Sequence, residues 1–277
     1  MNAPFVKSAT PYRAFSLSRV GAMIMRYTYL LRSSWPRVLE IVYWPLVTMV
    51  MWGFLQTYLN QQSGFLAAAG GTLIGAILLW DVVMRGQLGF SISFLEEMWS
   101  RNMANLLMSP LTRAEFLLSL MTMSVIRLLI STVPVTLLAI VFFGFNLWSL
   151  GIALGAFFAN LLITGWAVGT VVSGLVLRNG LGAEGFAWTI MFFIMPLCAV
   201  FYPVAILPAF IQPLSWALPP TYVFEGMRAL MIDGTFRGDL MLGALGINIV
   251  YLAVAVFTYV KLLDSARRNG SLLAIGE

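Results

Sequence analysis

SISFLEEMWSRNMANLLMSPLTR (residues 91–113) is a short polar segment between two long apolar runs. Its charged residues are Glu96, Glu97, Arg101 and Arg113. A charged segment that is joined at both ends to apolar runs is suited to receiving force from a soluble partner. The same pattern is also typical of an ordinary solvated loop helix, so the residues alone leave both interpretations open.

The first two thirds of this segment have the spacing of a single helix. Phe94, Met98, Arg101 and Asn105 recur at i, i+4, i+7 and i+11, which places them on one helical face. Glu97 precedes Arg101 by four residues, and this order favours an ion pair on a helix. We therefore expect one helix over residues 93–108.

A helix stop and a helix start follow within a few residues. Pro110 disfavours helical geometry at Ser109, so the first helix should end there. Thr112, followed by Glu115 three residues later, has the pattern of a capping box. The next helix should therefore begin directly after Thr112.

Composition places the whole chain among the integral membrane proteins. Of its 277 residues, 60% are hydrophobic and 10% are charged, whereas soluble proteins have about 25% charged residues. The chain has no histidine and a single cysteine, Cys198. Histidine-based catalysis, histidine or cysteine metal sites and an intrachain disulfide are therefore excluded. We expect no catalytic residue and no metal ligand.

The N-terminal segment, residues 1–36, is basic and contains no acidic residue. Over residues 12–31 the pattern is helical, with an apolar stripe and a basic side. The stripe and the basic side are represented by Val20 and Ile24 and by Arg19 and Arg26. A basic amphipathic helix of this kind lies at the membrane surface and contacts lipids. The alternative is a cytosolic helix that packs on protein.

Six apolar runs after this segment have the length that a spanning helix needs, about 20 residues. We expect an all-α membrane domain over residues 37–277 with spans at about 38–59, 65–90, 116–143, 148–177, 186–202 and 240–263. Lys and Arg outside the spans lie mainly on one side of this arrangement, twelve against two. By the positive-inside rule, both termini and residues 91–113 are then cytoplasmic.

Three charged residues lie inside the expected spans, namely Asp81, Arg85 and Arg127. Charges at such depth are costly and usually pair with one another inside the protein. At 1.5 Å per residue, Asp81 and Arg127 both lie about 16 Å from the cytoplasmic ends of their spans. We therefore predict that they face each other, with Arg85 as a second partner of Asp81. The group is either a structural ion-pair cluster or part of a translocation site.

Residues 203–239 begin as an apolar run that prolines interrupt. Each proline removes a backbone donor and clashes with the preceding turn, so a continuous helix is disfavoured. We expect short re-entrant helices over residues 203–231 that dip into the outer leaflet, followed within this range by a helix over 221–231. The residues that mark this outer cap are Pro203, Pro208, Pro219, Glu225 and Arg228. The alternative is a simple outer loop.

A phosphate-binding loop of the form G-x-x-x-x-G-K-[ST] is impossible in this chain. The two lysines, Lys7 and Lys261, do not follow a glycine. If ATP drives this protein, another polypeptide must bind the nucleotide.

Two parts of the sequence resemble a known family. NLLMSPLTR at residues 105–113, preceded by two glutamates and an arginine, is similar to the cytoplasmic loop of type-2 ABC transporter (ABC-2) permeases. YPVAILP at 202–208, followed by LPPTY at 218–222 and EGMR at 225–228, is similar to a later segment of the same family. The order of the expected elements is similar over nearly the whole chain. The chain departs from the family pattern at the charges inside its spans.

This resemblance implies an exporter of the bacterial inner (plasma) membrane that is powered by a separate ATP-binding (ABC) subunit. ATP and Mg²⁺ would be bound by that subunit, and no cofactor or nucleic acid by this chain. Two permease copies would pair, most simply as a homodimer. The docking face for the ATP-binding subunit would consist of Glu96, Glu97, Trp99, Arg101 and Asn105, with Leu107 and Pro110 setting the exit angle of the loop.

Two other functions remain open at the level of sequence. The chain is alternatively an ion-coupled secondary carrier that uses the charged residues inside its spans, or a non-transporting membrane scaffold with the same fold. The sequence does not name the cargo. The apolar and aromatic spans favour an amphipathic or lipidic cargo over a small hydrophilic ion.

Overall fold

The structure is a computed structural model that describes residues 15–62 and 72–269. All secondary structure in this part of the chain is helical, in agreement with the expected all-α class. In chain order the helices are α1 (Leu17–Arg32), α2 (Trp35–Gln62), α4 (Thr72–Trp99), α5 (Met103–Met108), α6 (Arg113–Phe143), η1 (Leu147–Leu150), α7 (Ile152–Asn179), η2 (Leu181–Ala183), α8 (Phe186–Ile194), η3 (Val204–Ile206), α9 (Gln212–Trp216), α10 (Pro219–Asp233) and α11 (Gly238–Asn269).

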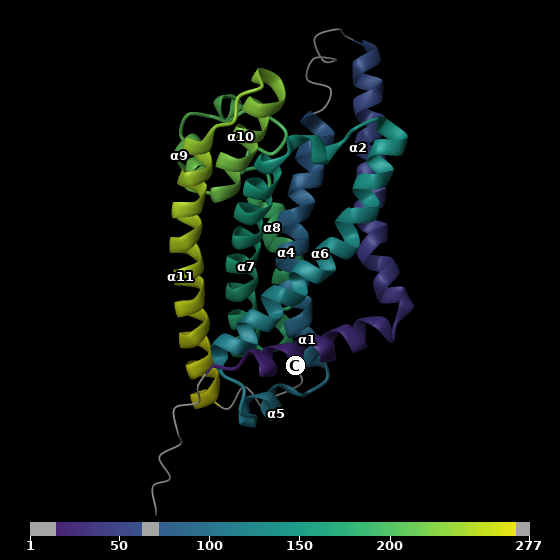
Figure 1. The fold of residues 1–277 in the computed structure, drawn as a ribbon. Coiled ribbons are helices and arrows are strands. Elements are labelled where there is room, and N and C mark those ends of the chain that lie inside the picture. The colour runs from purple at the N-terminus through teal and green to yellow at the C-terminus, as the bar shows by residue number, and fades with distance from the viewer. Residues whose placement is uncertain (1–14, 63–71, 270–277) are drawn as a thin grey trace, which may run out of the picture.

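In the part of the chain that the structure describes, five helices are long and apolar enough to cross a membrane, namely α2, α4, α6, α7 and α11. They run between the two ends of an elongated bundle (Figure 1), and α4 is the most buried of the five. α7 packs against α4 and α11, while α6 packs against α4 and α2. The chain therefore has the architecture of a multi-pass membrane protein.

Small residues explain why α4 and α7 approach each other so closely. A Cβ atom at Gly165 of α7 would lie 2.9 Å from the backbone oxygen of Val83 and the backbone nitrogen of Gln87, both on α4. Gly169, one turn later on α7, packs on the ring of Phe90. Glycines at this spacing permit the backbones of two membrane helices to meet, and they place α4 at the centre of the bundle.

Five of the six expected spans coincide with the long helices, although residues 65–71 of the second span lie outside the described residues. The expectation of a spanning helix over residues 186–202 is not confirmed. α8 covers Phe186–Ile194 only, and turns follow it. Pro196 accounts for this end, because proline lacks the helical N–H donor and its ring clashes with the preceding turn.

The chain nevertheless passes from one end of the bundle to the other between α7 and α10. Glu184, just before α8, accepts a hydrogen bond from Trp99 Nε1 at the C-terminal end of α4 (2.8 Å). The carbonyl oxygen of Val200 accepts one from Arg228 Nη1 of α10 (3.3 Å), and α10 packs near the N-terminal end of α4. α8 and the turns after it thus connect the two ends without a long helix.

α1 lies across the end of the bundle at which α4 ends and α6 begins, and α5 lies beyond α1 at the same end (Figure 1). The buried residues of α1 are Val20, Met23, Tyr27 and Leu31, whereas Ile24 is only partly buried. One stripe of α1 therefore packs on protein. Residues 12–14, which were expected to begin this helix, lie outside the described residues. α9 and α10 cover the opposite end.

Candidate functional site

The expected single helix over residues 93–108 is wrong, because the chain turns between α4 and α5. α4 ends at Trp99, and Arg101 has a φ of 55°, which a continuing right-handed helix does not allow. Asn102 makes the turn: its backbone N–H donates to the carbonyl oxygen of Glu97 (2.9 Å), and its side-chain amide donates to Glu97 Oε2 (2.8 Å). Arg101 and Asn105 therefore do not continue the face that Phe94 begins.

Glu97 is completely buried and is held by side chains other than the one that its spacing predicts. Its carboxylate accepts hydrogen bonds from Arg26 of α1 and from Asn102. The predicted pair with Arg101 does not form, since Arg101 lies in the turn and is exposed. The end of α4 is thus attached to α1 by a buried charge.

Glu96, the neighbouring acid, is also buried and binds two further arginines. Its Oε1 accepts a hydrogen bond from Arg127 Nη2 of α6 (2.9 Å) and a longer one from Arg37 Nη1 of α2 (3.4 Å). The predicted ion pair between Arg127 and Asp81 is therefore wrong. That prediction assumed that residues the same number of positions from the helix ends lie at the same depth. The assumption fails because α6 crosses α4 obliquely (Figure 1).

The start of α6 carries a third buried carboxylate, Glu115. The capping box is confirmed: Thr112 Oγ1 accepts from the backbone N–H of Glu115, and Glu115 Oε2 accepts from the backbone N–H of Thr112. The same carboxylate binds Arg19 of α1 through two nitrogens, at 3.0 and 2.5 Å. This hydrogen-bonded contact raises the pKa of Arg19 above its ordinary value. α1 is therefore attached to α6 as well as to α4.

The exposed surface at this end differs from the docking face that the sequence predicts. Trp99, Arg101 and Asn105 are exposed, but Glu96 and Glu97 are not, and Leu107 is only partly so. Met108, which the spacing did not single out, has 75% of its surface exposed and lies beside the exposed Pro110. The part of the expected face that a soluble protein can touch is the turn and α5.

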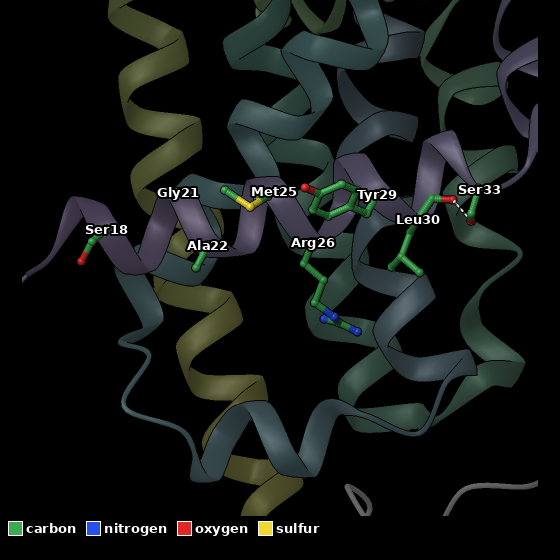
Figure 2. Close-up of a pocket in the computed structure, with 8 residues that line it drawn as sticks. All are labelled: Ser18, Gly21, Ala22, Met25, Arg26, Tyr29, Leu30 and Ser33. Carbon is green, nitrogen blue, oxygen red and sulfur yellow. Dashed lines mark hydrogen bonds between the residues drawn. The ribbon is translucent and has the colours of Figure 1, made fainter.

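A groove runs along α1 at the same end (Figure 2). It is lined by Ser18, Gly21, Ala22, Met25, Arg26, Tyr29, Leu30 and Ser33. Figure 2 shows Arg26 and Leu30 pointing from α1 toward α5. Arg19, Arg26 and Val20 contact the protein, so one side of α1 packs on the bundle. Its position at a membrane surface stays a prediction.

The charges inside the bundle line a second cavity, of about 600 Å³, between α2, α4 and α8. Arg85 donates from Nε to Oδ1 of Asp81 (3.2 Å), so the predicted partnership of these two residues is confirmed. Five tryptophans stand on the cavity wall, namely Trp44, Trp52, Trp80, Trp99 and Trp188. Glu96 and Arg127 also border the cavity.

At the opposite end, the charged pair of the expected cap forms within one helix. Residues 221–231 are helical as part of α10, which Pro219 begins. Glu225 Oε1 lies 2.9 Å from Arg228 Nη2 and accepts the backbone N–H of Val204 (2.7 Å). Pro203 precedes η3, and Pro208 lies in the turns between η3 and α9. The re-entrant position of this cap in a membrane stays a prediction.

Comparison with known proteins identifies the family. No curated protein matches the chain. The family model described as ABC-2 type transporter matches residues 22–232, which run from within α1 to within α10 and make up more than half of the chain. The match includes the turn, α5, the cavity between α2, α4 and α8, and nearly all of α10. The chain therefore belongs to the ABC-2 type transporter family, as a membrane-spanning permease subunit that is not itself catalytic.

Proposed function

We propose that this chain is the transmembrane subunit of an ATP-driven exporter, which works as a pair of copies and docks a separate ATP-binding subunit on the turn and α5. ATP and Mg²⁺ belong to that subunit. Glu96, Glu97 and Glu115 transmit the motion of the docked surface to the bundle. Both termini and the docked surface face the cytoplasm of a bacterial inner membrane, on the side that carries twelve of the cations.

The observation that carries this proposal is the way in which the exposed turn is attached. Glu97 lies directly before the turn and is fully buried against Arg26 of α1. Glu96 joins the same end of α4 to Arg127 of α6. Removing one partner of a buried ion pair costs about 3–5 kcal/mol. A force on the turn therefore displaces α1, α4 and α6 together instead of moving a loose loop.

The chain crosses the membrane six times in this proposal. The five long helices provide five crossings, and the segment between Glu184 and Val200 provides the sixth. That segment joins the two ends of the bundle, as its contacts with Trp99 and Arg228 require. An even number of crossings places both termini on the same side.

The docking part of the proposal is tested by purifying the tagged chain from its native membrane in mild detergent. A soluble ATP-binding subunit should remain bound. Arg101→Glu combined with Met108→Asp alters only exposed side chains, so it should abolish retention of that subunit and leave the melting temperature unchanged. Arg178→Glu, which alters an exposed arginine at the end of α7, is the matched control and should retain it.

Retention of the ATP-binding subunit by the double variant would remove the turn and α5 from the docking surface. Absence of any ATP-binding subunit from the wild-type preparation would favour the ion-coupled carrier instead. The Asp81–Arg85 pair inside the bundle is the observation that favours that second candidate.

Pairing of two copies is assigned to α2, whose apolar side chains are largely exposed in the single chain, among them Tyr43, Val47 and Phe54. Cys198 is buried, so a Cys198→Ala background gives a chain without cysteine. In that background Val47→Cys should form a disulfide-linked dimer in membranes. Val254→Cys, which is similarly exposed on α11, should not. Equal cross-linking of the two positions would contradict the assignment.

A further inference from the structure

The cavity between α2, α4 and α8 is long and narrow. Along α4 its lining extends from Ile77 to Trp99, a length of about 33 Å at 1.5 Å per residue. The apolar core of a bilayer is about 30 Å thick. A cavity of about 600 Å³ stretched over that length fits an extended chain better than a compact molecule.

The wall of the cavity is mostly apolar and aromatic. Trp44 and Trp52 come from α2, Trp80 from α4, and Trp188 and Phe192 from α8. Aromatic and apolar walls with a few placed polar groups are typical of sites for small molecules. The aromatic and apolar part of this wall suits a hydrocarbon chain.

Arg85 stands partway along the cavity, next to Asp81. It uses Nε to bind Asp81, and its side chain is 17% exposed. Among the described residues, no group accepts a hydrogen bond from Nη1 or Nη2 of Arg85. The two terminal nitrogens of a guanidinium form a fork that matches the oxygens of a phosphate or carboxylate. Arg85 is thus held by Asp81 with its fork free.

A second arginine lies at the α1 end of the same cavity. Arg127 binds Glu96 through Nη2. Within residues 15–62 and 72–269, neither its buried Nε nor the buried Oε2 of Glu96 has a hydrogen-bond partner. Arg85 and Glu96 are separated by about 16 Å along α4. The cavity therefore offers guanidinium groups at two levels, each beside a carboxylate that limits how tightly an anion binds.

We propose that this cavity binds an elongated amphipathic anion, with its apolar chain along the tryptophan wall and its phosphate or carboxylate at the fork of Arg85. Asp81 orients Arg85 and keeps the affinity low enough for release. This inference names the cargo class of the proposed exporter and rests on that proposed function. An anionic head supplies the acceptor oxygens that Arg85 lacks in an apolar environment, where an unsatisfied charge is costly.

Binding is tested on the purified permease in phosphatidylcholine nanodiscs without the ATP-binding subunit. The probes share one alkyl chain and differ in head group: dodecyl phosphate, dodecanoate, dodecyl maltoside and dodecyltrimethylammonium. Tryptophan fluorescence reports binding, because five tryptophans line the cavity. The anionic probes should bind more tightly than the neutral and cationic ones, and the preferred anion then identifies the head group.

Two substitutions with opposite expected signs make the test specific. Arg85→Gln should weaken binding of the anions about tenfold, which is the size expected for losing a charged hydrogen bond. The affinity for dodecyl maltoside should not change. Asp81→Asn should strengthen binding of the same anions. Arg85→Lys keeps the charge but lacks the two terminal nitrogens, so its affinity for the anions should lie between those of the wild type and Arg85→Gln. Arg178→Gln, outside the cavity, is the matched control and should bind every probe like the wild type.

Three results would overturn the inference. The first is unchanged anion binding in Arg85→Gln. The second is a preference for the cationic probe, which would make Asp81 the binding residue. The third is an equal loss of binding of all probes in Arg85→Gln and in Asp81→Asn, which is the result expected if the ion pair is purely structural. If these variants still retain the ATP-binding subunit, the failure concerns the cargo and not the proposed exporter.

Discussion

The two ends of the bundle are held together in different ways. At the α1–α5 end, buried carboxylates on α4 and α6 bind arginines from other helices, as in Glu97 with Arg26 and Glu115 with Arg19. At the α9–α10 end, the ion pair of Glu225 and Arg228 lies within one helix. Glu225 and Arg228 also make hydrogen bonds to the backbone of Val204 and Val200.

This difference has a mechanical consequence. Ion pairs between helices make separate elements move as one body, whereas a pair within a helix stabilises only that helix and its neighbours. Ion pairs between helices therefore hold α1, α4 and α6 together at the α1–α5 end, whereas short helices cover the α9–α10 end.

Arg26→Met should be the most damaging single substitution of the set. It leaves the carboxylate of Glu97 buried with Asn102 as its remaining partner. An uncompensated buried charge costs about 3–5 kcal/mol, and the remaining bond to Asn102 places the expected loss near the lower bound. The free energy of unfolding in mixed detergent micelles measures it.

Two variants show whether the buried charge is the cause. Arg26→Met with Glu97→Met should recover most of the stability, because both charges are gone. Arg32→Met, which replaces an exposed arginine of the same helix, should change stability by less than about 0.5 kcal/mol. A double variant as unstable as Arg26→Met would show that the ion pair is not the main contact.

Arg228→Met should have a smaller effect at the opposite end. Glu225 is partly exposed and still accepts the backbone N–H of Val204 after the substitution. The expected loss is that of one charged hydrogen bond, about 1.5 kcal/mol, in the same unfolding measurement. Arg237→Met, at an exposed pair near the start of α11, should leave stability unchanged. A loss equal to that of Arg26→Met would mean that the two ends are attached alike.

The sequence predicts the features that depend on neighbours in the chain. Helix class, the five long helices and the capping box of Thr112 and Glu115 follow from periodicity and local spacing, as does the pairing of Arg85 with Asp81 at i, i+4. The end of α8 before Pro196 also has a local signal, although apolar length outweighed it in the prediction of a fifth long span.

The candidate site depends on contacts that spacing does not encode. Glu97 and Arg26 are 71 residues apart, and Glu96 and Arg127 are 31 apart. The i, i+4 pattern pointed to Arg101 instead, but the bonds of Asn102 to Glu97 turn the chain before that residue. The available signal was indirect: two adjacent acids at the end of an apolar run need buried cations, and α1 supplies one of them.

Thr112→Ala separates local capping from attachment between helices. The substitution removes the side-chain oxygen that accepts the backbone N–H of Glu115, while the carboxylate of Glu115 can still bind Arg19. Loss of such a cap costs about 1 kcal/mol, which the same unfolding measurement resolves. Thr122→Ala, on the exposed face of α6, should cost less than about 0.5 kcal/mol. If Thr112→Ala costs as much as Arg26→Met, the cap holds α1 in place as well.

Asp264→Asn should have the smallest effect, although it breaks an ion pair between two helices at the same end. Asp264 of α11 lies 2.9 Å from Arg113 of α6, but both side chains are more than one third exposed. Water already stabilises such charges, so an exposed pair contributes about 0.2–1 kcal/mol and less at high salt. Unfolding measured at low and high salt should show a loss near the lower bound that vanishes at high salt. A loss that persists at high salt would mean that α11 is attached to α6 as firmly as α1 is attached to α4. The rigid body at this end would then include four helices joined to the turn.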